Sequence, residues 1–467
     1  MNSKIGYGLG DMASCMFWKI FFTYLPFFYS AIYGLTLVDA TLLMLVIRVW
    51  DAVSDPIMGI VADRTSSKWG RYRPYLLWGA VPFGIAGVLL FTVPYFSYEG
   101  KRLWAYLTYF FMMTVYKFIN VPYGAMLGVI TSDSEEKTVF SSYRMFFAYA
   151  GGFLILAIWE PLCRFFNLVR GIDKSALDAG SWRCSMALIS AICVLLFLLC
   201  FSFTKETIVK ENKKTSVKAD FLGLVKNVPW WILLVVVLFF NLFGAIRYTI
   251  GPFYFASLVG EGAVIRLFSF EFLFYAGLFF AVGEFANMLG VSLTPYVTRR
   301  IGKKSTFVVV LLGMCVFSLL FFFIPINNVG YWLMIICQIL ISFIAGVASP
   351  LVWSMFADVA DYSEWKYGVS STAFIFSSSS MAQKLGGAFG GTIAMALLAL
   401  FGYDIDMGAT QSEFALLGVK SMMSLIPAIS LVLALAAVLI YPLDTMKMRF
   451  IQEQLRCSCA SCEKNAL

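Results

Sequence analysis

The stretch Arg48-Val-Trp-Asp51-Ala-Val-Ser-Asp55-Pro56 places three charged side chains inside a run that is otherwise apolar enough to cross a membrane. Charged side chains are costly in a bilayer, and those that occur there usually serve a function. On an α-helix, Arg48, Asp51 and Asp55 occupy positions i, i+3 and i+7 and share one face, which could line a polar cavity. The simpler alternative is an internal salt bridge that only neutralises itself. We interpret the stretch as a cation or proton site.

The composition indicates a membrane protein. Hydrophobic residues make up 60% of the 467 residues and charged residues only 13%, and the mean hydropathy is +0.82. A soluble protein of this composition would have too little polar surface. The 46 phenylalanines, 23 tyrosines and 12 tryptophans suit lipid-facing surfaces and interfacial belts. The net charge of +8 comes from basic residues in short loops that form no continuous stripe, so we expect the lipid bilayer, and no nucleic acid, as a partner.

The sequence also excludes several kinds of catalysis. It contains no histidine, which rules out Ser-His and Cys-His nucleophilic mechanisms. The ten cysteines form no disulfide framework, and Cys457-Ser-Cys459-Ala-Ser-Cys462 lacks a fourth metal ligand. An integral-membrane enzyme is an alternative, but no nucleophile is paired with a base. We therefore predict that the protein is not an enzyme and has no catalytic residue, no metal site and no cofactor.

About twelve apolar runs are long enough to span a membrane as helices of roughly 20 residues. The first six start near residues 13, 37, 75, 103, 139 and 184, and the others near 230, 268, 304, 330, 370 and 416. A lysine-rich segment between the sixth and seventh runs is the longest polar connection. The sequence predicts an all-α membrane protein with a six-helix half at residues 1–204, a cytoplasmic linker at 205–228, a second half at 229–441 and a cytoplasmic tail at 442–467.

Lysine and arginine in the short loops predict the orientation, because they favour the cytoplasmic side. One side carries the larger set of basic residues, which comprises Arg64, Lys68, Arg71, Arg73, the linker lysines, Arg299, Arg300, Lys303, Lys304, Lys447 and Arg449. The opposite side carries fewer, and its last loop is acidic at Asp404, Asp406 and Glu413. We expect a multi-pass protein with both termini in the cytoplasm.

The two halves repeat each other. Pro122-Tyr-Gly-Ala-Met126 with Asp133 beyond it resembles Pro350-Leu-Val-Trp-Ser-Met355 with Asp361 beyond it, and both pairs are offset by 228 residues. Parallel six-span repeats with a binding site at the midplane are typical of major facilitator transporters, which work by alternating access. We expect the basic loops after the second and eighth spans to clip the two halves together on the cytoplasmic side, by pairing with helix ends and carboxylates.

Six motifs in order resemble the glycoside-pentoside-hexuronide:cation symporter family, over nearly the whole chain. They are Trp50-Asp51-Ala-Val-Ser-Asp55-Pro56, Lys68-Trp-Gly-Arg-Tyr-Arg-Pro74, Asn120-Val-Pro-Tyr-Gly124, Arg299-Arg-Ile-Gly-Lys-Lys304, Ala357-Asp-Val-Ala-Asp-Tyr362 and Gln383-Lys384-Leu-Gly-Gly387. Any one alone would be a weak signal, whereas six in the right order are specific. Within the family, the chain is similar to the melibiose and glucuronide carriers. The resemblance implies a major facilitator fold of 12 transmembrane helices in two six-helix halves.

The resemblance also assigns roles to residues. Asp51 and Asp55 match the paired carboxylates that hold the coupling cation, and Lys384 matches a lysine near that site. Arg144 matches an arginine of the sugar site. Asp358 and Asp361 match a signature of the inner gate, to which we add Asp63, Arg64 and Arg71 of the basic loop after the second span. Trp353 could stack on a pyranose ring, although in this chain a single aromatic residue is more often part of the core or faces lipid.

Two departures from the melibiose pattern concern the substrate. Cys15 and Asn120 stand where that carrier has acidic residues, so the site has lost two negative charges. Lys19 lies one helical turn beyond Cys15 on the same face. These changes favour a substrate that carries a carboxylate or a sulfate. The alternative is that Lys19 extends towards the membrane interface or pairs with Asp11.

A third departure concerns the cation. Lys117 stands where the family usually has a hydroxyl that helps to bind Na⁺, and its ammonium would lie beside Asp51 and Asp55. That charge would disfavour a sodium ion, so we favour H⁺ over Na⁺ as the coupling ion. Uncoupled exchange or facilitated diffusion would leave the same residues in place.

Together these features predict a secondary active transporter that imports a glycoside or hexuronide by cation symport. We expect it to work as a monomer in the bacterial inner (plasma) membrane. A transporter of lipids or other amphipathic solutes from the same superfamily is the nearest alternative.

Overall fold

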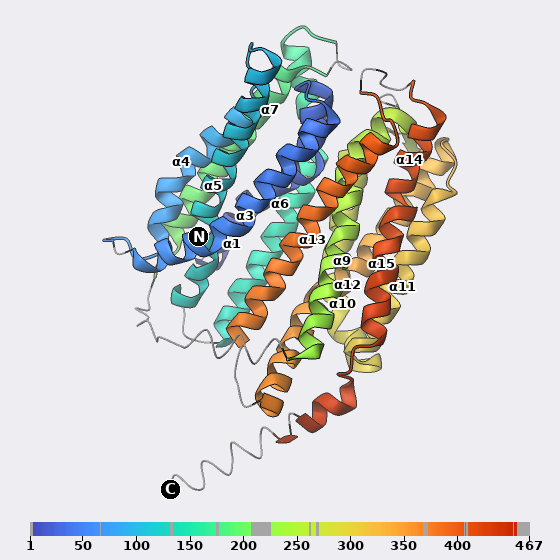
Figure 1. The fold of residues 1–467 in the computed structure, drawn as a ribbon. Helices are drawn as coiled ribbons and strands as arrows, with labels where there is room; N and C mark the ends of the chain where they lie inside the picture. The colour runs from blue at the N-terminus through green and yellow to red at the C-terminus, as the bar shows by residue number, and fades with distance from the viewer. Residues whose placement is uncertain are drawn as a thin grey trace. The chain divides into compact units, whose positions relative to one another are not determined.

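The computed structural model describes residues 3–65, 67–130, 134–173, 177–206, 226–260, 263–267, 270–367, 372–405, 407, 410–451 and 453–454 (Figure 1). Within helices, a few side chains lie outside this description, among them those of Arg48, Asp63 and Arg64. The described residues are almost entirely helical, as the composition predicts.

Long helices make up the first part of the chain. They are α1 (Ser3–Thr23), α3 (Leu37–Arg64), α4 (Arg73–Leu90), α5 (Tyr98–Ile130), α6 (Ser134–Val169) and α7 (Ala179–Phe203), with the short α2 (Leu25–Phe27) and the π-helical η1 (Phe28–Ile32) after α1. The chain bends by 46° between α1 and the segment Leu25–Ile32. Pro26 lies in the first turn after the break, where its missing N–H leaves no hydrogen bond unmade.

The second part of the chain adds further long helices and one hairpin. The elements are α9 (Val228–Tyr254), η2 (Phe255–Val259), β1 (Val264–Leu267), β2 (Phe270–Leu273), α10 (Ala276–Ile301), α11 (Lys303–Phe322), α12 (Asn328–Tyr367), α13 (Thr372–Leu400), α14 (Glu413–Met423) and α15 (Leu425–Leu439). Among the described residues, nine helices are long and apolar enough to cross a membrane, and the bent segment Ser3–Ile32 makes a tenth. The helices α3 (28 residues) and α5 (33 residues) are also long enough to span a membrane, although neither is among these apolar spans. This set agrees with the twelve expected spans.

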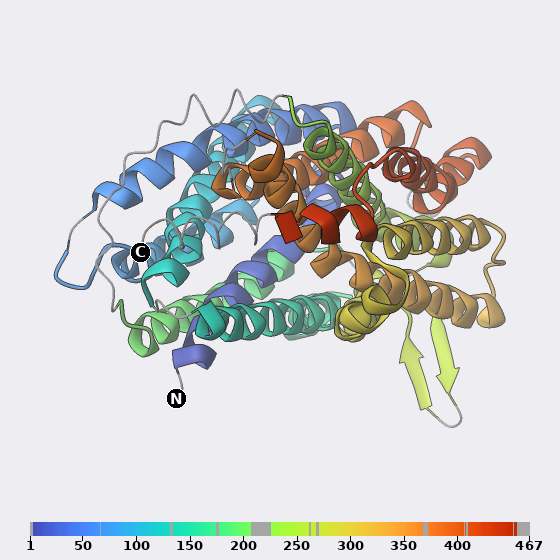
Figure 2. The same ribbon diagram turned by 90° about the horizontal axis from the view of Figure 1, so that it is seen from below.

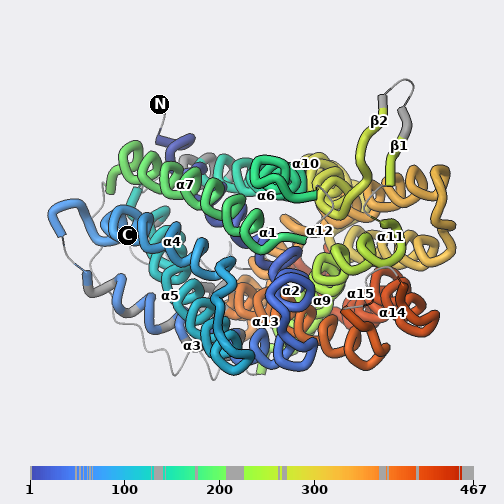
Figure 3. Tube along the Cα trace, turned by 90° about the horizontal axis from the view of Figure 1, so that it is seen from above, coloured from blue at the N-terminus to red at the C-terminus, as the bar shows by residue number. Residues whose placement is uncertain are grey.

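The hairpin is a departure from the all-α prediction. β1 and β2 pair antiparallel, with Val264 opposite Leu273 and Leu267 opposite Phe270, and they lie side by side in both end-on views (Figure 2, Figure 3). β-branched and aromatic residues in this segment favour strand over helix. The eighth span was expected near residue 268, and α10 begins at Ala276 because the hairpin takes up the residues before it.

The chain divides into two compact units. The first comprises Met1–Asn212, Tyr248–Phe285 and Gly391–Val419, and the second comprises Lys213–Arg247, Ala286–Gly390 and Lys420–Leu467. In the first unit α1 packs along α6 and α7, α4 packs on α5 and α7, and α3 packs on α5 (Figure 1). In the second, α11 packs against α12 and α15.

Close approach of α1 to α6 depends on a pair of glycines. A Cβ atom at Gly151 of α6 would lie 2.8 Å from the carbonyl oxygen of Met12 on α1. The neighbouring Gly152 faces Lys19, whose Cε would lie 3.3 Å from such an atom. Small residues let helix backbones approach each other in a membrane, and here they bring the polar side chains of α1 against α6.

Candidate functional site

The two aspartates of the opening stretch meet a lysine from another helix. The Lys117 ammonium on α5 lies 2.5 Å from Asp51 Oδ1 and 2.7 Å from Asp55 Oδ1 on α3. The Lys117 and Asp51 side chains are only 4% and 5% exposed, and that of Asp55 is 25% exposed. Because the aspartates lie one helical turn apart on one face, a single ammonium reaches both.

This group carries an uneven charge. Taken by themselves, two carboxylates and one ammonium sum to one negative charge. One carboxylate can therefore take up a proton while the other stays paired with Lys117. Asp55, the more exposed aspartate, is the member that solvent reaches most readily.

Further contacts fix α3 against α5 beside the ion pairs. The indole N–H of Trp50 donates to the Thr114 hydroxyl at 3.0 Å, and its ring centroid lies 4.4 Å from that of Phe110. The aspartates and the lysine therefore project from helices that are already held together, which favours one defined geometry.

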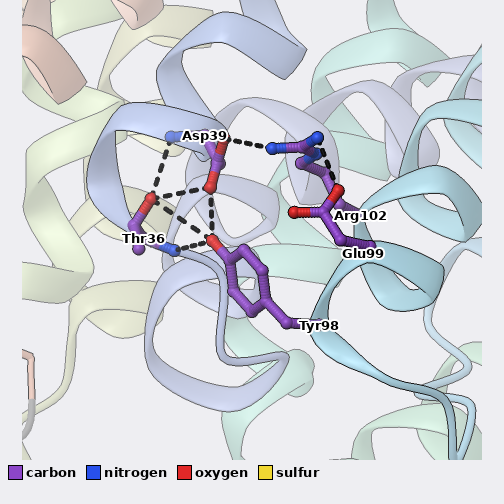
Figure 4. Close-up of polar contacts among 5 residues, drawn as sticks. All are labelled: Thr36, Asp39, Tyr98, Glu99 and Arg102. Carbon is purple, nitrogen blue, oxygen red and sulfur yellow. Dashed lines mark hydrogen bonds and ion pairs between the residues drawn. The ribbon is translucent and has the colours of Figure 1, made fainter.

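A second polar cluster joins the starts of the same two helices (Figure 4). Thr36 caps α3 by accepting a hydrogen bond from the Asp39 backbone N–H at 3.1 Å. The Tyr98 hydroxyl of α5 donates to the Asp39 carboxylate. Arg102 lies 3.6 Å from Asp39 and 2.6 Å from Glu99. Arg102 and Glu99 are 41% and 70% exposed, and exposed ion pairs contribute little stability.

The polar side chains of α1 form two further ion pairs. Arg144 of α6 binds Asp11, with its Nε 3.1 Å from Asp11 Oδ2 and its Nη2 3.4 Å from Oδ1. Lys19 forms an ion pair with Glu284 in the first half of α10, and Glu284 is only 2% exposed. Cys15 lies between them in sequence as a part-buried free thiol. Within the described residues, α1 therefore presents a stripe of charges that are balanced in pairs.

Lys19 has a second neighbour, Tyr248 of α9. The Tyr248 hydroxyl of α9 donates to the Glu284 oxygen that Lys19 binds, and the Lys19 ammonium lies 4.5 Å from the centre of the Tyr248 ring. Lys19 thus pairs with Glu284, whereas Asp11, its expected alternative partner, pairs with Arg144. The charge excess on which the prediction of an anionic substrate rested is compensated by Glu284.

Other predicted substrate and cation residues are placed individually. The Asn120 side chain donates to the Tyr116 carbonyl one turn earlier on its own helix, at 3.0 Å. Trp353 lies on α12 and Lys384 on α13, and both are part-buried residues of the second unit.

The loop before α4, which includes the predicted gate residue Arg71, folds around a carboxylate that the sequence analysis did not single out. Glu206 accepts hydrogen bonds from the backbone N–H groups of Arg71, Tyr72 and Arg73 at 2.8, 2.7 and 2.7 Å. A carboxylate is favoured at a helix N-terminus, because the first N–H groups have no partner within the helix. Gly70 has φ +112°, and a Cβ there would lie 2.6 Å from the Glu206 carboxyl carbon. Only glycine fits.

The corresponding loop in the second unit uses its lysines instead. Lys303 lies 2.7 Å from both Asp358 oxygens, and Lys304 donates to the carbonyls of Leu439 and Tyr441 at 3.0 and 2.7 Å. Lysine is favoured where a helix ends, because the last carbonyls are unpaired. Asp361 lies one turn after Asp358 and is part-buried. The loop pairs with a helix end and a carboxylate as expected, but these contacts lie within the second unit, whereas a clip between the two halves was expected. The side chains of Asp63 and Arg64 lie outside the described set.

A comparison with solved structures agrees with this architecture. The fold matches a crystal structure of the nucleoside transporter NupG with a TM-score of 0.64 at 14% identity, covering 95% of this chain and 100% of that one. The molecule therefore has the fold of a multi-pass membrane transporter.

The sequence comparisons narrow the class. Residues 6–445 match the MFS/sugar transport protein family, and the chain belongs to that family. It is 33% identical over 456 residues to the putative glycoside/cation symporter YagG of Escherichia coli (strain K12), covering 97% of this chain and 95% of the relative. It is 29% identical to the isoprimeverose transporter of Lactiplantibacillus pentosus, covering 97% and 91%. The protein is accordingly a transporter and not an enzyme.

Proposed function

We propose that the protein imports a glycoside by symport with a cation, and that the cation is a proton. The two six-helix halves predicted from the sequence would alternate access to a central site. The protein would act as a monomer in the bacterial inner membrane, with both termini in the cytoplasm. Relatives named as a glycoside/cation symporter and as an isoprimeverose transporter support the substrate class.

The observation that carries the proposal is the Lys117 group. Two carboxylates share one ammonium in it, so one of them can take up a proton while the other stays paired with Lys117. Because the ammonium already lies within 2.7 Å of both aspartates, a sodium ion between them would be repelled. A proton bound to Asp55 does not have to fit between the aspartates and the ammonium. Lys384 stays a candidate for modulating this site.

The charge pairs on α1 favour an uncharged sugar. Arg144 is balanced by Asp11 and Lys19 by Glu284, so neither cation offers an uncompensated charge to an anionic substrate. Arg144 nevertheless remains 36% exposed, and its remaining N–H groups can donate to sugar hydroxyls. Cys15, Asn120 and Trp353 remain candidates for further contacts with the sugar.

The test is uptake into sealed vesicles under an imposed proton gradient or an imposed sodium gradient. Labelled isoprimeverose represents an uncharged glycoside, and labelled 4-nitrophenyl β-glucuronide represents an anionic one. We expect isoprimeverose to accumulate with the proton gradient and not with the sodium gradient. Sodium-driven accumulation would contradict proton coupling, and uptake of the glucuronide alone would contradict the uncharged substrate. Equilibration that no gradient can drive above the outside concentration would identify an uncoupled facilitator.

A further inference from the structure

The first unit contains a pocket away from the ion pairs described above. Its empty volume, counted together with the open space at its mouth, is about 690 Å³. It lies where α1 ends, α6 ends, α7 begins and α10 begins, and Figure 3 shows α2, α6, α7 and α10 at this end. None of the residues assigned above to the cation or the sugar lines it.

The wall of this pocket combines aromatic rings with charged groups. Tyr24, Phe27, Trp182 and Tyr275 contribute the rings, and Glu160 and Arg164 contribute a carboxylate and a guanidinium. The apolar C–H face of a pyranose packs on an aromatic ring, while its hydroxyls can donate to a carboxylate and accept from a guanidinium. A lipid tail would need no charged groups, whereas a sugar can use both the aromatic rings and the charged groups.

The carboxylate is held in place by its neighbours. One Glu160 oxygen accepts from the Tyr24 hydroxyl at 2.9 Å and from the Gly277 backbone N–H at 3.0 Å. The Tyr275 hydroxyl donates to the Ala157 carbonyl at 2.6 Å. A Cβ at Gly277 would lie 2.1 Å from the Leu156 carbonyl oxygen, so only glycine allows α10 to begin this close to α6.

The aromatic part is equally fixed. The Trp182 ring centroid lies 5.5 Å from that of Trp159, in an edge-on arrangement, and 5.8 Å from that of Phe28, in a stacked one. Trp182 is only 5% exposed, so it forms a closed wall of the pocket. Tyr275 is part-buried, and its ring keeps the exposed surface on which a sugar can pack.

We propose that this pocket is a second binding subsite for the sugar ring of a glycoside, separate from the site near Arg144. The proposal rests on the proposed function, since it takes the same substrate class. With the orientation proposed above, the pocket lies at the extracytoplasmic end, where an incoming glycoside binds before it reaches the central site. The sugar hydroxyls would compete with the Tyr24 hydroxyl and the Gly277 N–H for Glu160. This competition would loosen the contact between α6 and α10.

The experiment measures protection of a cysteine at the rim of the pocket. Leu177 lines the pocket and is 46% exposed, so Leu177→Cys offers a reactive thiol. The full-length protein in lipid nanodiscs is treated with a maleimide, and mass spectrometry follows the peptide that contains residue 177. Isoprimeverose or 4-nitrophenyl β-glucuronide at ten times its dissociation constant should slow the labelling by about tenfold, in proportion to the unoccupied fraction.

Variants locate the protecting ligand. Adding Arg164→Gln or Tyr275→Leu should abolish the protection, while Arg183→Gln serves as the control, because Arg183 adjoins Trp182 on α7 but does not line the pocket. Arg144→Lys should reduce transport and leave the protection unchanged. Absence of protection by both sugars, or protection that depends on Arg144 and not on Arg164, would overturn the subsite.

Uptake in the same preparations separates this proposal from the proposed function. Gradient-driven uptake without protection at residue 177 would leave the transport proposal standing and refute the subsite. Protection at residue 177 without gradient-driven uptake would support the subsite and refute the transport proposal.

Discussion

Two lysines in the first unit are held in almost opposite ways. Lys117 shares its charge between two aspartates of one neighbouring helix, Asp51 and Asp55. Lys19 binds a single carboxylate, Glu284, which also accepts from the Tyr248 hydroxyl. The two groups therefore differ in whether one carboxylate can take up a proton while another stays paired with the ammonium.

The comparison also concerns what each group can do during transport. A neutral, well-paired group resists change, because separating its partners leaves charges unpaired in a region of low polarity. A group with one surplus negative charge can gain or lose a proton while its lysine stays paired. We therefore propose that the Lys117 group couples transport to the cation, and that the Lys19 group is a structural or gating contact.

The largest effect is expected from Asp55→Asn. The substitution makes the Lys117 group neutral like the Lys19 group, so the need for a coupling cation disappears. Proton-driven accumulation of glycoside should fall to simple equilibration, while exchange of labelled for unlabelled sugar continues. Asp39→Asn on the same helix is the control, because Asp39 forms an exposed pair with Arg102 and should retain accumulation. Persistent accumulation in Asp55→Asn would remove Asp55 from the coupling mechanism.

Lys117→Gln should have the next largest effect, because it leaves two buried carboxylates one turn apart. We expect a loss of roughly 3–5 kcal/mol of stability, which is typical when one partner of a buried ion pair is removed. Sodium ions should recover part of it, since the position of the ammonium becomes available to a metal ion. Thermal unfolding in detergent with sodium or choline chloride measures this. Equal melting temperatures in the two salts would refute the idea that Lys117 takes the place of a sodium ion.

Glu284→Gln tests the neutral group and should cost less, because it leaves one unpaired charge rather than two. The lysine is also 22% exposed, which lessens the penalty. The double variant Lys19→Gln/Glu284→Gln should recover stability relative to Glu284→Gln, with a coupling energy of roughly 1–3 kcal/mol. Thermal unfolding of the two single variants and the double variant gives this energy. Additive losses would show that Lys19 and Glu284 do not interact.

The smallest effect is expected from glycines beside the two groups. Gly59 lies one turn beyond Asp55, and no described atom lies within 4 Å of a Cβ placed there. Gly59→Ala should therefore stabilise the protein by roughly 0.5–1 kcal/mol through its better helix propensity. At Gly152 such an atom would lie 3.3 Å from Lys19 Cε, so Gly152→Ala should gain less or lose stability. Unfolding temperatures of both variants measure the difference. Equal gains would mean that the Lys19 group is not tightly packed.

The sequence predicted features that depend on helical spacing. Asp51 and Asp55 share a face because they lie four residues apart, and the long apolar runs predicted the helices. Lys117 was expected beside them only through the resemblance to a family. Lys303 and Asp358 also follow the predicted pairing of a basic loop with a carboxylate.

Other contacts could not be predicted because they join residues distant in sequence. Lys19 and Glu284 are 265 residues apart, and no local pattern relates them. Glu206 follows the sixth span, and its role depends on the backbone of a loop 135 residues away. The hairpin at Val264–Leu273 was missed because its apolar residues resemble the start of a membrane span. A charged residue next to a span, such as Glu206, is a signal that future sequence analysis could use.

The hydrogen bonds of Glu206 have a practical consequence for protein engineering. Glu206 is fixed to the loop before α4, and on the other side of the linker the Lys226 carbonyl accepts a hydrogen bond from Tyr367 at 3.0 Å. Asn227 accepts one from the Trp230 backbone N–H at 3.3 Å. A reporter domain can be inserted between Glu206 and Lys226, or the chain can be divided there and the two fragments co-expressed. In both cases the hydrogen bonds of Glu206 stay within the first fragment and those of Lys226 within the second. The same insertion placed before Glu206 would detach the cap of α4.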